Sequence, residues 1–380
     1  MNDAAALSHI LERGPLTRGD LRDLTGLSKP TISEALRRLT EAKLVSVVGY
    51  VSAGPGPNAE VYAVNPDAAY AVALSVRDRG DRDTPAVTAA VTDLAGTVRA
   101  RLESAVDFAR TDPVTGVVDI VEAVCKEAGV AREPVAQVQI AVAGSYDPRG
   151  DVLHHVEVPG WGRPGLVEDL RHRLGVPVGV DNDVNLAAVA ERAQGAGRDA
   201  ESFALLWLGE SGLGLAIDLG GTLLRGARGG AGEIGYMPIG GPGGGNFQDL
   251  VGGAAVLELA AAHGIATPTA AGTMAAAAVR AAEGDTAAHD FITALAGRIA
   301  IGLSAVVAVL DPPLVVIGGE VGQAGGPPLG TAVATALSEA APLDTTIATT
   351  LVEDDAALLG AQEAGRAMVR ATLLANLSRP

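Results

Sequence analysis

Apolar residues in the first 66 positions recur at helical spacing in three short segments. The first segment ends at Gly14-Pro15, and its apolar face comprises Ala6, Leu7, Ile10 and Leu11. Thr17 and Asp20 have the spacing of a capping box, which predicts that a second helix begins at about residue 18. The third helix follows Ser28 as its N-cap, and its apolar face comprises Ile32, Ala35, Leu36 and Leu39. Residues 1–66, here called the head, are therefore expected to hold three short helices.

The turn at Thr25-Gly26 before the third helix predicts a helix-turn-helix, in which the third helix lies in the major groove of DNA. The extended runs "KLVSVVGYV" and "AEVYAVNP", joined by "SAGPGPN", predict a hairpin wing beside it. The wing tip has no Arg or Lys, so we expect DNA contacts mainly from the third helix. The residues expected to contact DNA are Ser28, Lys29, Thr31, Ser33, Arg37 and Arg38. A small helical dimerisation module is the alternative interpretation of the head.

From residue 67 onward, strand patterns and helix patterns alternate, which predicts an α/β body. A turn signal at 93–96 between two apolar runs predicts a hairpin, so the first sheet is expected to be mixed. A second strand-rich set begins near Ser202, and is followed by helices over 254–310 and by the buried strand of "PPLVVIGGEV". Two strand-rich cores, each followed by helices, predict two lobes.

The net charge of −17 does not come from the head. The head holds seven Lys+Arg and seven Asp+Glu, whereas the remaining residues hold 21 against 38. A neutral head on an acidic body is compatible with DNA binding, because at physiological salt charges more than about 10 Å from the DNA are largely screened. The N-terminus lacks the pattern of a secretory signal, and the longest uncharged apolar run, 299–310, is shorter than a membrane span. We therefore expect a cytoplasmic location and no membrane contact. Cys125 is the single cysteine, which excludes an internal disulfide.

Three segments carry a family resemblance: "VDNDVNLAAVAE", "GESGLGLAIDLGGTLLRGARGGAGEIGYMPI" and "LDPPLVVIGGEV". They resemble the ROK family, named for repressors, open reading frames and sugar kinases. The resemblance implies an α/β body with the two-lobed, actin-like ATPase (ribonuclease H-like) fold. A winged helix-turn-helix in front of that body is the layout of the family's transcriptional repressors. The domains expected are 1–66 for the winged helix-turn-helix, 67–182 for the first lobe and 183–380 for the second, with the last helix packing back on the first lobe.

The resemblance also implies a sugar site between the lobes. Asn182 and Asp183 match an Asn-Asp pair that binds sugar hydroxyls in the family's kinases, where the Asp is the general base. Glu233 matches the family's sugar-binding Glu. The other ligand-binding residues expected at this site are Gly144, Glu157, Tyr236 and Asp249. The alternative is that Asp181, Asn182 and Asp183 only cap the helix that follows them.

The carboxylates expected in this site lead to a hypothesis about the effector. Like charges packed together favour a cation that relieves them, so an amino sugar or its oligomer would suit Glu157, Asp183, Glu233 and Asp249. A degenerate pocket that binds nothing is the alternative.

The chain departs from the kinases of the family in its phosphate turns. The stretch "LSVRDRGDRDTPAV" lacks their Asp-x-Gly-Gly-Thr, and Glu210 brings a carboxylate into the second turn. We therefore expect no catalytic activity and no cofactor.

The chain also departs at the family's zinc site. The positions of the zinc-binding His and Cys are held by Tyr236, Gly240, Pro242 and Phe247. No metal is expected, because no soft ligand remains. Tyr236 and Phe247 are expected to fill the vacated space.

Together these features predict a DNA-binding transcriptional repressor that acts on operator DNA as a homodimer or homotetramer and responds to a sugar or amino-sugar effector. A sugar kinase with a regulatory head, and a ligand-independent DNA-binding protein, are the alternatives.

Overall fold

The computed structural model describes residues 2–52, 58–77, 87–156, 158–210, 212–240, 244–340, 344–353 and 355–378. The chain divides into two compact units. Unit 1 comprises Met1–Val142, Glu157–Val180 and Ala361–Pro380, and unit 2 comprises Ala143–Val156 and Asp181–Gly360.

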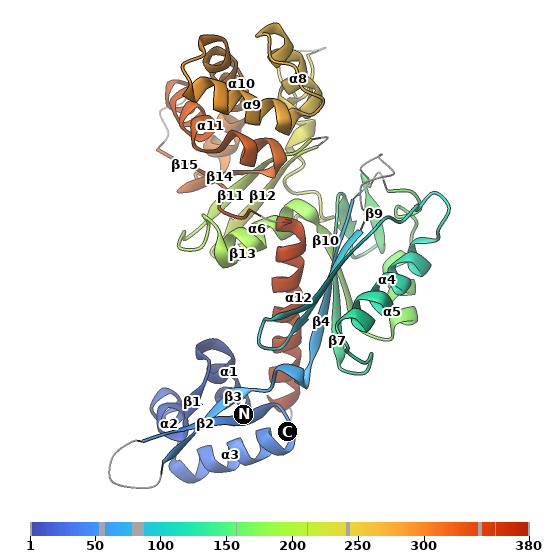
Figure 1. Cartoon of the computed structure of the whole chain (residues 1–380), viewed down its shortest axis with the longest axis vertical. Coiled ribbons are helices and arrows are strands. Elements are labelled where there is room, and N and C mark those ends of the chain that lie inside the picture. The colour runs from blue at the N-terminus through green and yellow to red at the C-terminus, as the bar shows by residue number, and fades with distance from the viewer. Residues whose placement is uncertain are drawn as a thin grey trace. The chain divides into compact units, whose positions relative to one another are not determined.

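The head is a winged helix-turn-helix, as predicted (Figure 1). Its helices are α1 (Asn2–Arg13), α2 (Arg18–Thr25) and α3 (Lys29–Glu41). Its strands are β1 (Leu16–Thr17), β2 (Val45–Val51) and β3 (Ala59–Val64), paired antiparallel in the order β1-β3-β2. The capping box of Thr17 and Asp20 and the N-cap of Ser28 are both confirmed. Sequence reasoning missed β1, because a strand of two residues leaves no alternating pattern.

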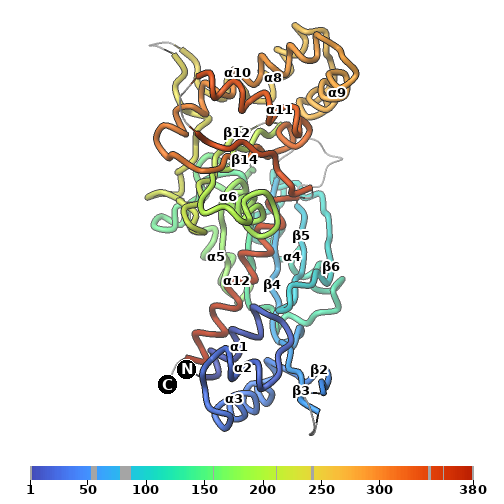
Figure 2. The backbone as a smooth tube through the Cα atoms, turned by 90° about the vertical axis from the view of Figure 1, so that its left-hand side faces the viewer, coloured from blue at the N-terminus to red at the C-terminus, as the bar shows by residue number. Residues whose placement is uncertain are grey.

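The apolar faces of the head helices meet in one core. The four apolar residues predicted on α1 and the four predicted on α3 are all buried. Part of the same core comes from the other end of the chain: Val369 on α12 (Ala356–Ser378) is buried in it, and Leu373, Leu374 and Leu377 pack against it. Figure 2 also shows α12 beside the head. The last helix is therefore part of the packing of the head.

The five-stranded sheet of unit 1 has the order β10-β7-β4-β5-β6. Its strands are β4 (Tyr70–Val76), β5 (Val87–Asp93), β6 (Val98–Ser104), β7 (Val135–Val142) and β10 (Val178–Asn182). β4 runs parallel to β7 and antiparallel to β5, and β5 pairs antiparallel with β6, so the predicted mixed sheet and its hairpin are confirmed. The helices of this unit's body are α4 (Pro113–Glu127) and α5 (Leu166–Leu174).

The five-stranded sheet of unit 2 has the order β13-β12-β11-β14-β15. Its strands are β11 (Phe203–Leu208), β12 (Leu213–Leu219), β13 (Thr222–Leu223), β14 (Leu314–Gly318) and β15 (Thr346–Thr349). The helices are α6 (Asp183–Gln194), α7 (Phe247–Val251), α8 (Gly253–Ala262), α9 (Ala270–Ala282), α10 (Thr286–Leu310) and α11 (Gly319–Ala340). A small hairpin of β8 (Ser145–Asp147) and β9 (Val152–His154) belongs to the same unit.

Alternation along β11 places its side chains in two cores. Ala204, Leu206 and Leu208 belong to the core formed with α7 to α11, whereas Phe203 and Leu205 belong to the core that includes residues of α6. A strand covered on both faces reads as an unbroken apolar run, which explains the pattern "FALLWL". The sheet thus holds α6, the helix that begins at the Asn182-Asp183 pair, against its own face.

Among the described residues, α10 is the helix long and apolar enough to cross a membrane. In this fold, apolar residues of α10 are part of the hydrophobic core of unit 2. Phe291, Ile299 and Leu303 on α10 are fully buried in the core of unit 2.

Candidate functional site

The outer face of α3 carries the residues predicted to contact DNA. Ser28 caps the helix, and its hydroxyl lies 2.8 Å from the hydroxyl of Thr31. Lys29, Arg37 and Arg38 are exposed, while Ser33 is half-buried. The face of α3 that points into the head core is thus separate from the polar side chains predicted to reach DNA.

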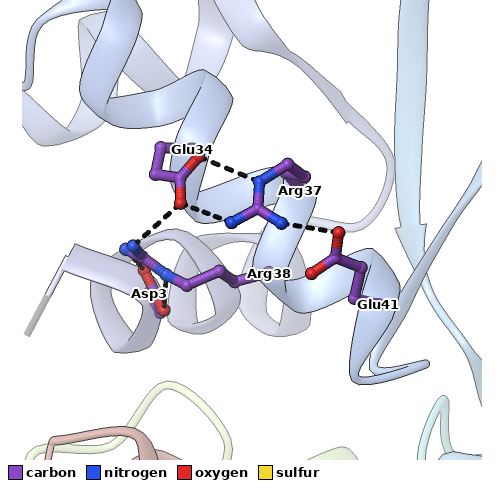
Figure 3. A network of polar contacts seen from close by, with 5 residues as sticks. All are labelled: Asp3, Glu34, Arg37, Arg38 and Glu41. Atoms are coloured by element: carbon purple, nitrogen blue, oxygen red, sulfur yellow. Dashed lines mark hydrogen bonds and ion pairs between the residues drawn. The ribbon is translucent and has the colours of Figure 1, made fainter.

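Both arginines of α3 are held by carboxylates (Figure 3). Arg37 donates to Glu34 from Nε at 3.0 Å and from Nη2 at 2.6 Å, and to Glu41 from Nη1 at 2.6 Å. Arg38 donates to Asp3 from Nε at 2.7 Å and from Nη2 at 2.6 Å. The pKa of Glu34 lies below its ordinary value because it accepts hydrogen bonds from Arg37. Both guanidinium groups therefore have carboxylate partners within the head.

Sequence reasoning did not identify these carboxylate partners. Glu34 and Glu41 stand three and four residues from Arg37, a spacing at which side chains on one helix meet, so this signal was present. Asp3 is 35 residues from Arg38, and only the packing of α1 on α3 brings the two together.

A second polar cluster ties the wing to α2. Arg18, the first residue of α2, donates to Glu60 of β3 at 2.6 Å and to the hydroxyl of Tyr62. The Tyr62 hydroxyl in turn donates to Glu60 at 2.5 Å. Burial raises the pKa of Tyr62. Arg18 was missed as a candidate, although it is about half exposed at the start of a head helix.

In unit 2, Asn182 is the N-cap of α6. Its Oδ1 accepts hydrogen bonds from the backbone N–H groups of Val184 at 2.9 Å and Asn185 at 3.2 Å. Its Nδ2 donates to the backbone oxygen of Gly144 at 3.2 Å. Capping is therefore a use of Asn182 in this fold, as the alternative interpretation held. Its role in ligand binding remains a prediction.

Gly144 is a position where only glycine fits. Its φ is +140°, and a Cβ there would lie 2.9 Å from the backbone oxygen of His154. The next residue, Ser145, donates from its hydroxyl to Oε1 of Glu233 at 2.5 Å. The side chains of Asn182 and Glu233 thus bond to adjacent residues of one turn. This turn brings three of the predicted ligand-binding residues together.

Tyr236 lies against His155. The two rings are 5.4 Å apart between centroids, and the Tyr236 hydroxyl is 3.3 Å from Nδ1 of His155. Tyr236 is 62% exposed, so the expectation that it fills the vacated zinc space is wrong. Phe247 does fill the interior, since it is fully buried and a Cβ on Gly302 would lie 2.3 Å from its ring. Ser145 and His155 were missed as site residues, because no short-range pattern points to them.

Asp249 and Asp183, which were also predicted to bind ligand, form hydrogen bonds in different parts of unit 2. Asp249 forms a capping box with Asn246 at the start of α7, and its Oδ2 accepts the Asn246 N–H at 2.9 Å. Asp183 accepts the N–H of Val184 at 2.9 Å. Glu157 lies outside the described residues. The cluster of four carboxylates therefore remains a hypothesis.

The Glu210 carboxylate occupies the N-terminus of α9. Its two oxygens accept the backbone N–H groups of Ala270 and Ala271, each at 2.8 Å. Backbone N–H groups at a helix N-terminus are a common binding site for phosphate, and here a carboxylate of the same chain uses two of them. The first phosphate turn lies largely outside the described residues. Within the described part of the chain, no cluster of three or more His, Cys, Asp and Glu side chains could hold a metal ion.

Two family profiles match the chain. The profile of the ROK family matches residues 84–364. The profile of the MarR family matches residues 1–49, which contain α1 to α3.

Similar curated proteins include repressors and kinases. The xylose repressor of Bacillus subtilis is 24% identical over 243 residues, which are 63% of this chain and 60% of that protein. The bifunctional enzyme NanE/NanK of Brucella suis is 37% identical over 154 residues, which are 40% of this chain and 28% of that enzyme. The matched region thus spans less than two thirds of the length of these proteins.

Similar solved structures agree in fold. A ROK family transcriptional regulator, a homolog of the E. coli MLC protein, has a TM-score of 0.75 at 20% identity and covers 98% of both chains. The ROK hexokinase from Thermus thermophilus has a TM-score of 0.63 at 24% identity, covering 80% of this chain and 99% of its own.

Proposed function

The chain belongs to the ROK family, and on this basis we propose that it is a transcriptional repressor that binds operator DNA and senses a sugar or amino-sugar effector. The observation that carries the proposal is the winged helix-turn-helix in front of the ROK body, with an exposed polar face on α3. The xylose repressor of Bacillus subtilis, a similar protein, supports the sugar-dependent part. A repressor of this kind acts in the cytoplasm.

The effector site we propose is the turn at Gly144-Ser145 with the side chains that bond to it. After its bonds to Gly144 and to the start of α6, the Asn182 amide retains one N–H donor, and the Glu233 carboxylate retains acceptor positions beside its bond from Ser145. Such groups donate to and accept from sugar hydroxyls at defined angles. Tyr236 and His155 add an exposed pair of rings in the same unit, and an aromatic face suits the apolar face of a sugar ring.

The route by which effector binding reaches the head is proposed to be α12. Gly360, near the start of α12, lies so close to Leu186 of α6 that a Cβ would be 1.6 Å from the Leu186 backbone oxygen. Farther along, Val369 of the same helix is buried in the head core. A ligand that moves the N-terminus of α6 would therefore displace α12. The shift between the two conformations of the protein is limited by the difference in the ligand's affinity for them.

We propose that the chain is not a kinase, although kinases are among its relatives. The physical reason is Glu210, whose carboxylate takes two N–H groups at the N-terminus of α9 and brings negative charge to a loop that corresponds to a phosphate turn. The active form is proposed to be a homodimer or homotetramer, because paired heads match two half-sites about one helical turn apart.

The test combines DNA selection with calorimetry on the full chain. Random-sequence duplex DNA bound by the protein at raised salt should converge on a two-fold symmetric sequence. A panel of neutral and amino sugars should then include one whose heat of binding is lost when Glu233 is replaced by Gln. No enriched sequence, or ADP released from ATP in the presence of a sugar, would refute the proposal.

A further inference from the structure

The exposed ridge of α3 alternates acidic and basic groups. At 3.6 residues per turn, Pro30, Glu34, Arg37 and Glu41 fall on the face opposite the buried Ile32, Ala35, Leu36 and Leu39. This ridge is the part of a recognition helix that faces the base edges when the helix lies in the major groove. Arg38 stands to one side of it and is held by Asp3 of α1.

The presence of two carboxylates, Glu34 and Glu41, on a ridge proposed to face DNA needs a physical explanation. A Glu that approaches DNA is repelled by the phosphates and loses water, so it costs affinity unless a base supplies a donor. In the major groove the cytosine N4 amine is the donor that pairs with Glu or Asp side chains. Glu34 is the sixth residue of α3, in the N-terminal half of a helix whose N-terminal residues contact bases in this motif.

The hydrogen bonds of Arg37 leave a defined set of donors. A guanidinium has five N–H donors, and three of those on Arg37 bind Glu34 and Glu41. Nη1 and Nη2 each retain one N–H, which together match the number of donors that the O6 and N7 acceptors of guanine take. Glu34 meanwhile accepts two bonds from Arg37 and one from Arg38 among about four acceptor positions of a carboxylate.

From this geometry we infer that Arg37 and Glu34 act together as the specificity-determining pair of the head, with Arg37 donating to a guanine and Glu34 accepting from the amine of a cytosine in the same or the next base pair. A G·C pair presents two acceptors and one donor in the major groove, which is the complement of what the pair retains. The side-on bond between Glu34 and Arg37 keeps the guanidinium in one orientation, so less rotamer entropy is lost on binding. This inference rests on the proposed function.

Glu41 has a different role in the same network. It binds Nη1 of Arg37 from the last turn of α3, beyond the residues expected to touch bases. Its charge opposes phosphate contact at every DNA sequence alike. Glu41→Gln is therefore a matched control for Glu34→Gln, since each change removes the negative charge of one carboxylate that binds Arg37.

The experiment is selection from random duplex DNA with the full chain, followed by affinity measurements on the selected site with each base pair changed in turn. The wild type should show a G·C pair whose replacement costs about 5- to 150-fold in affinity. Arg37→Ala should lose the guanine preference, and Glu34→Gln should lose the cytosine preference. Glu41→Gln should keep both preferences and bind all sequences more tightly. Replacing that guanine by 7-deazaguanine, which lacks the N7 acceptor, should weaken the wild type and leave Arg37→Ala unchanged.

The outcomes separate this inference from the proposed function. If the wild type enriches one sequence while Arg37→Ala and Glu34→Gln retain every base preference, the specificity pair is refuted and the repressor function stands. If the wild type enriches no sequence, both fail. Circular dichroism melting of each variant shows whether a loss of binding comes from unfolding.

Discussion

Asn182 donates a hydrogen bond from its side-chain amide to the backbone oxygen of Gly144 at 3.2 Å, while its carbonyl oxygen caps α6. One side chain thus joins a helix N-terminus to Gly144, and the next residue, Ser145, donates from its hydroxyl to Glu233. This double use makes the two halves of the amide separable by mutation, because an aspartate retains the cap acceptor and lacks the N–H donor.

We expect Asn182→Ala to lower the free energy of unfolding by about 0.5–2 kcal/mol, since the N-cap is lost. Asn182→Asp should retain most of that stability and should lose effector affinity, since the bond to Gly144 is broken. Urea unfolding and calorimetry on both variants check this. Equal effector affinity in Asn182→Asp and the wild type would show that the bond to Gly144 does not shape the site.

Gly360 offers a second test, directed at the contact between α12 and α6. A Cβ at Gly360 would lie 1.6 Å from the Leu186 oxygen, so Gly360→Ala should destabilise the protein by about 1–3 kcal/mol or more. Gly297 on α10 is the matched control, because a Cβ there meets nothing within 4 Å. Gly297→Ala should be neutral or stabilising by up to about 1 kcal/mol. Thermal melting of the two variants distinguishes them, and similar melting temperatures would contradict the close contact.

Asp3 is the bidentate partner of Arg38 in the head. In Asp3→Asn the guanidinium is freed from its bidentate partner, so it can neutralise one more phosphate. The slope of log affinity against log salt should become steeper by about 0.9. Filter binding to non-specific duplex DNA from low to moderate salt measures this slope. Asp23→Asn, which frees Arg22 on α2, is the control at another ion pair of the head. A slope unchanged by Asp3→Asn would mean that Arg38 does not reach the backbone.

Glu191 makes stability depend on pH. Burial raises the pKa of its carboxyl above the ordinary 4.5, against the opposing effect of hydrogen bonds from Thr350 and the Ala196 N–H. The folded protein therefore holds this proton more tightly than the unfolded chain does. The stabilisation is fully present below pH 4.5 and is lost as the pH rises through the raised value.

Glu191→Gln should remove this loss, since its amide is neutral throughout, its oxygen can accept the Ala196 N–H, and its NH2 group can donate to the Thr350 hydroxyl. The free energy of unfolding of the wild type should fall relative to Glu191→Gln as the pH rises above about 4.5. Urea unfolding of the two proteins across this range measures the difference. A constant difference at all pH values would refute the assignment to Glu191.

Much of the head could be predicted from the sequence because its signals are local. The capping box of Thr17 and Asp20, the cap at Ser28 and the apolar faces of α1 and α3 each lie within a few turns of one helix. The hairpin at 93–96 is likewise a short-range feature. For the proposed effector site, the resemblance indicated Asn182 and Glu233, and in the structure their side chains bond to the adjacent residues Gly144 and Ser145.

The amino-acid sequence by itself determined the local features of the fold. These are where helices begin, which of their faces are apolar, and that strands and helices alternate after residue 66. The tertiary structure decided which distant groups meet. Asp3 binds Arg38, Ser145 binds Glu233, and Val369 enters the core of the head. These contacts depend on chain segments 35, 88 and more residues apart being closed onto one another by core packing. Periodicity and capping act over only a few residues, so they carry no signal for such pairs.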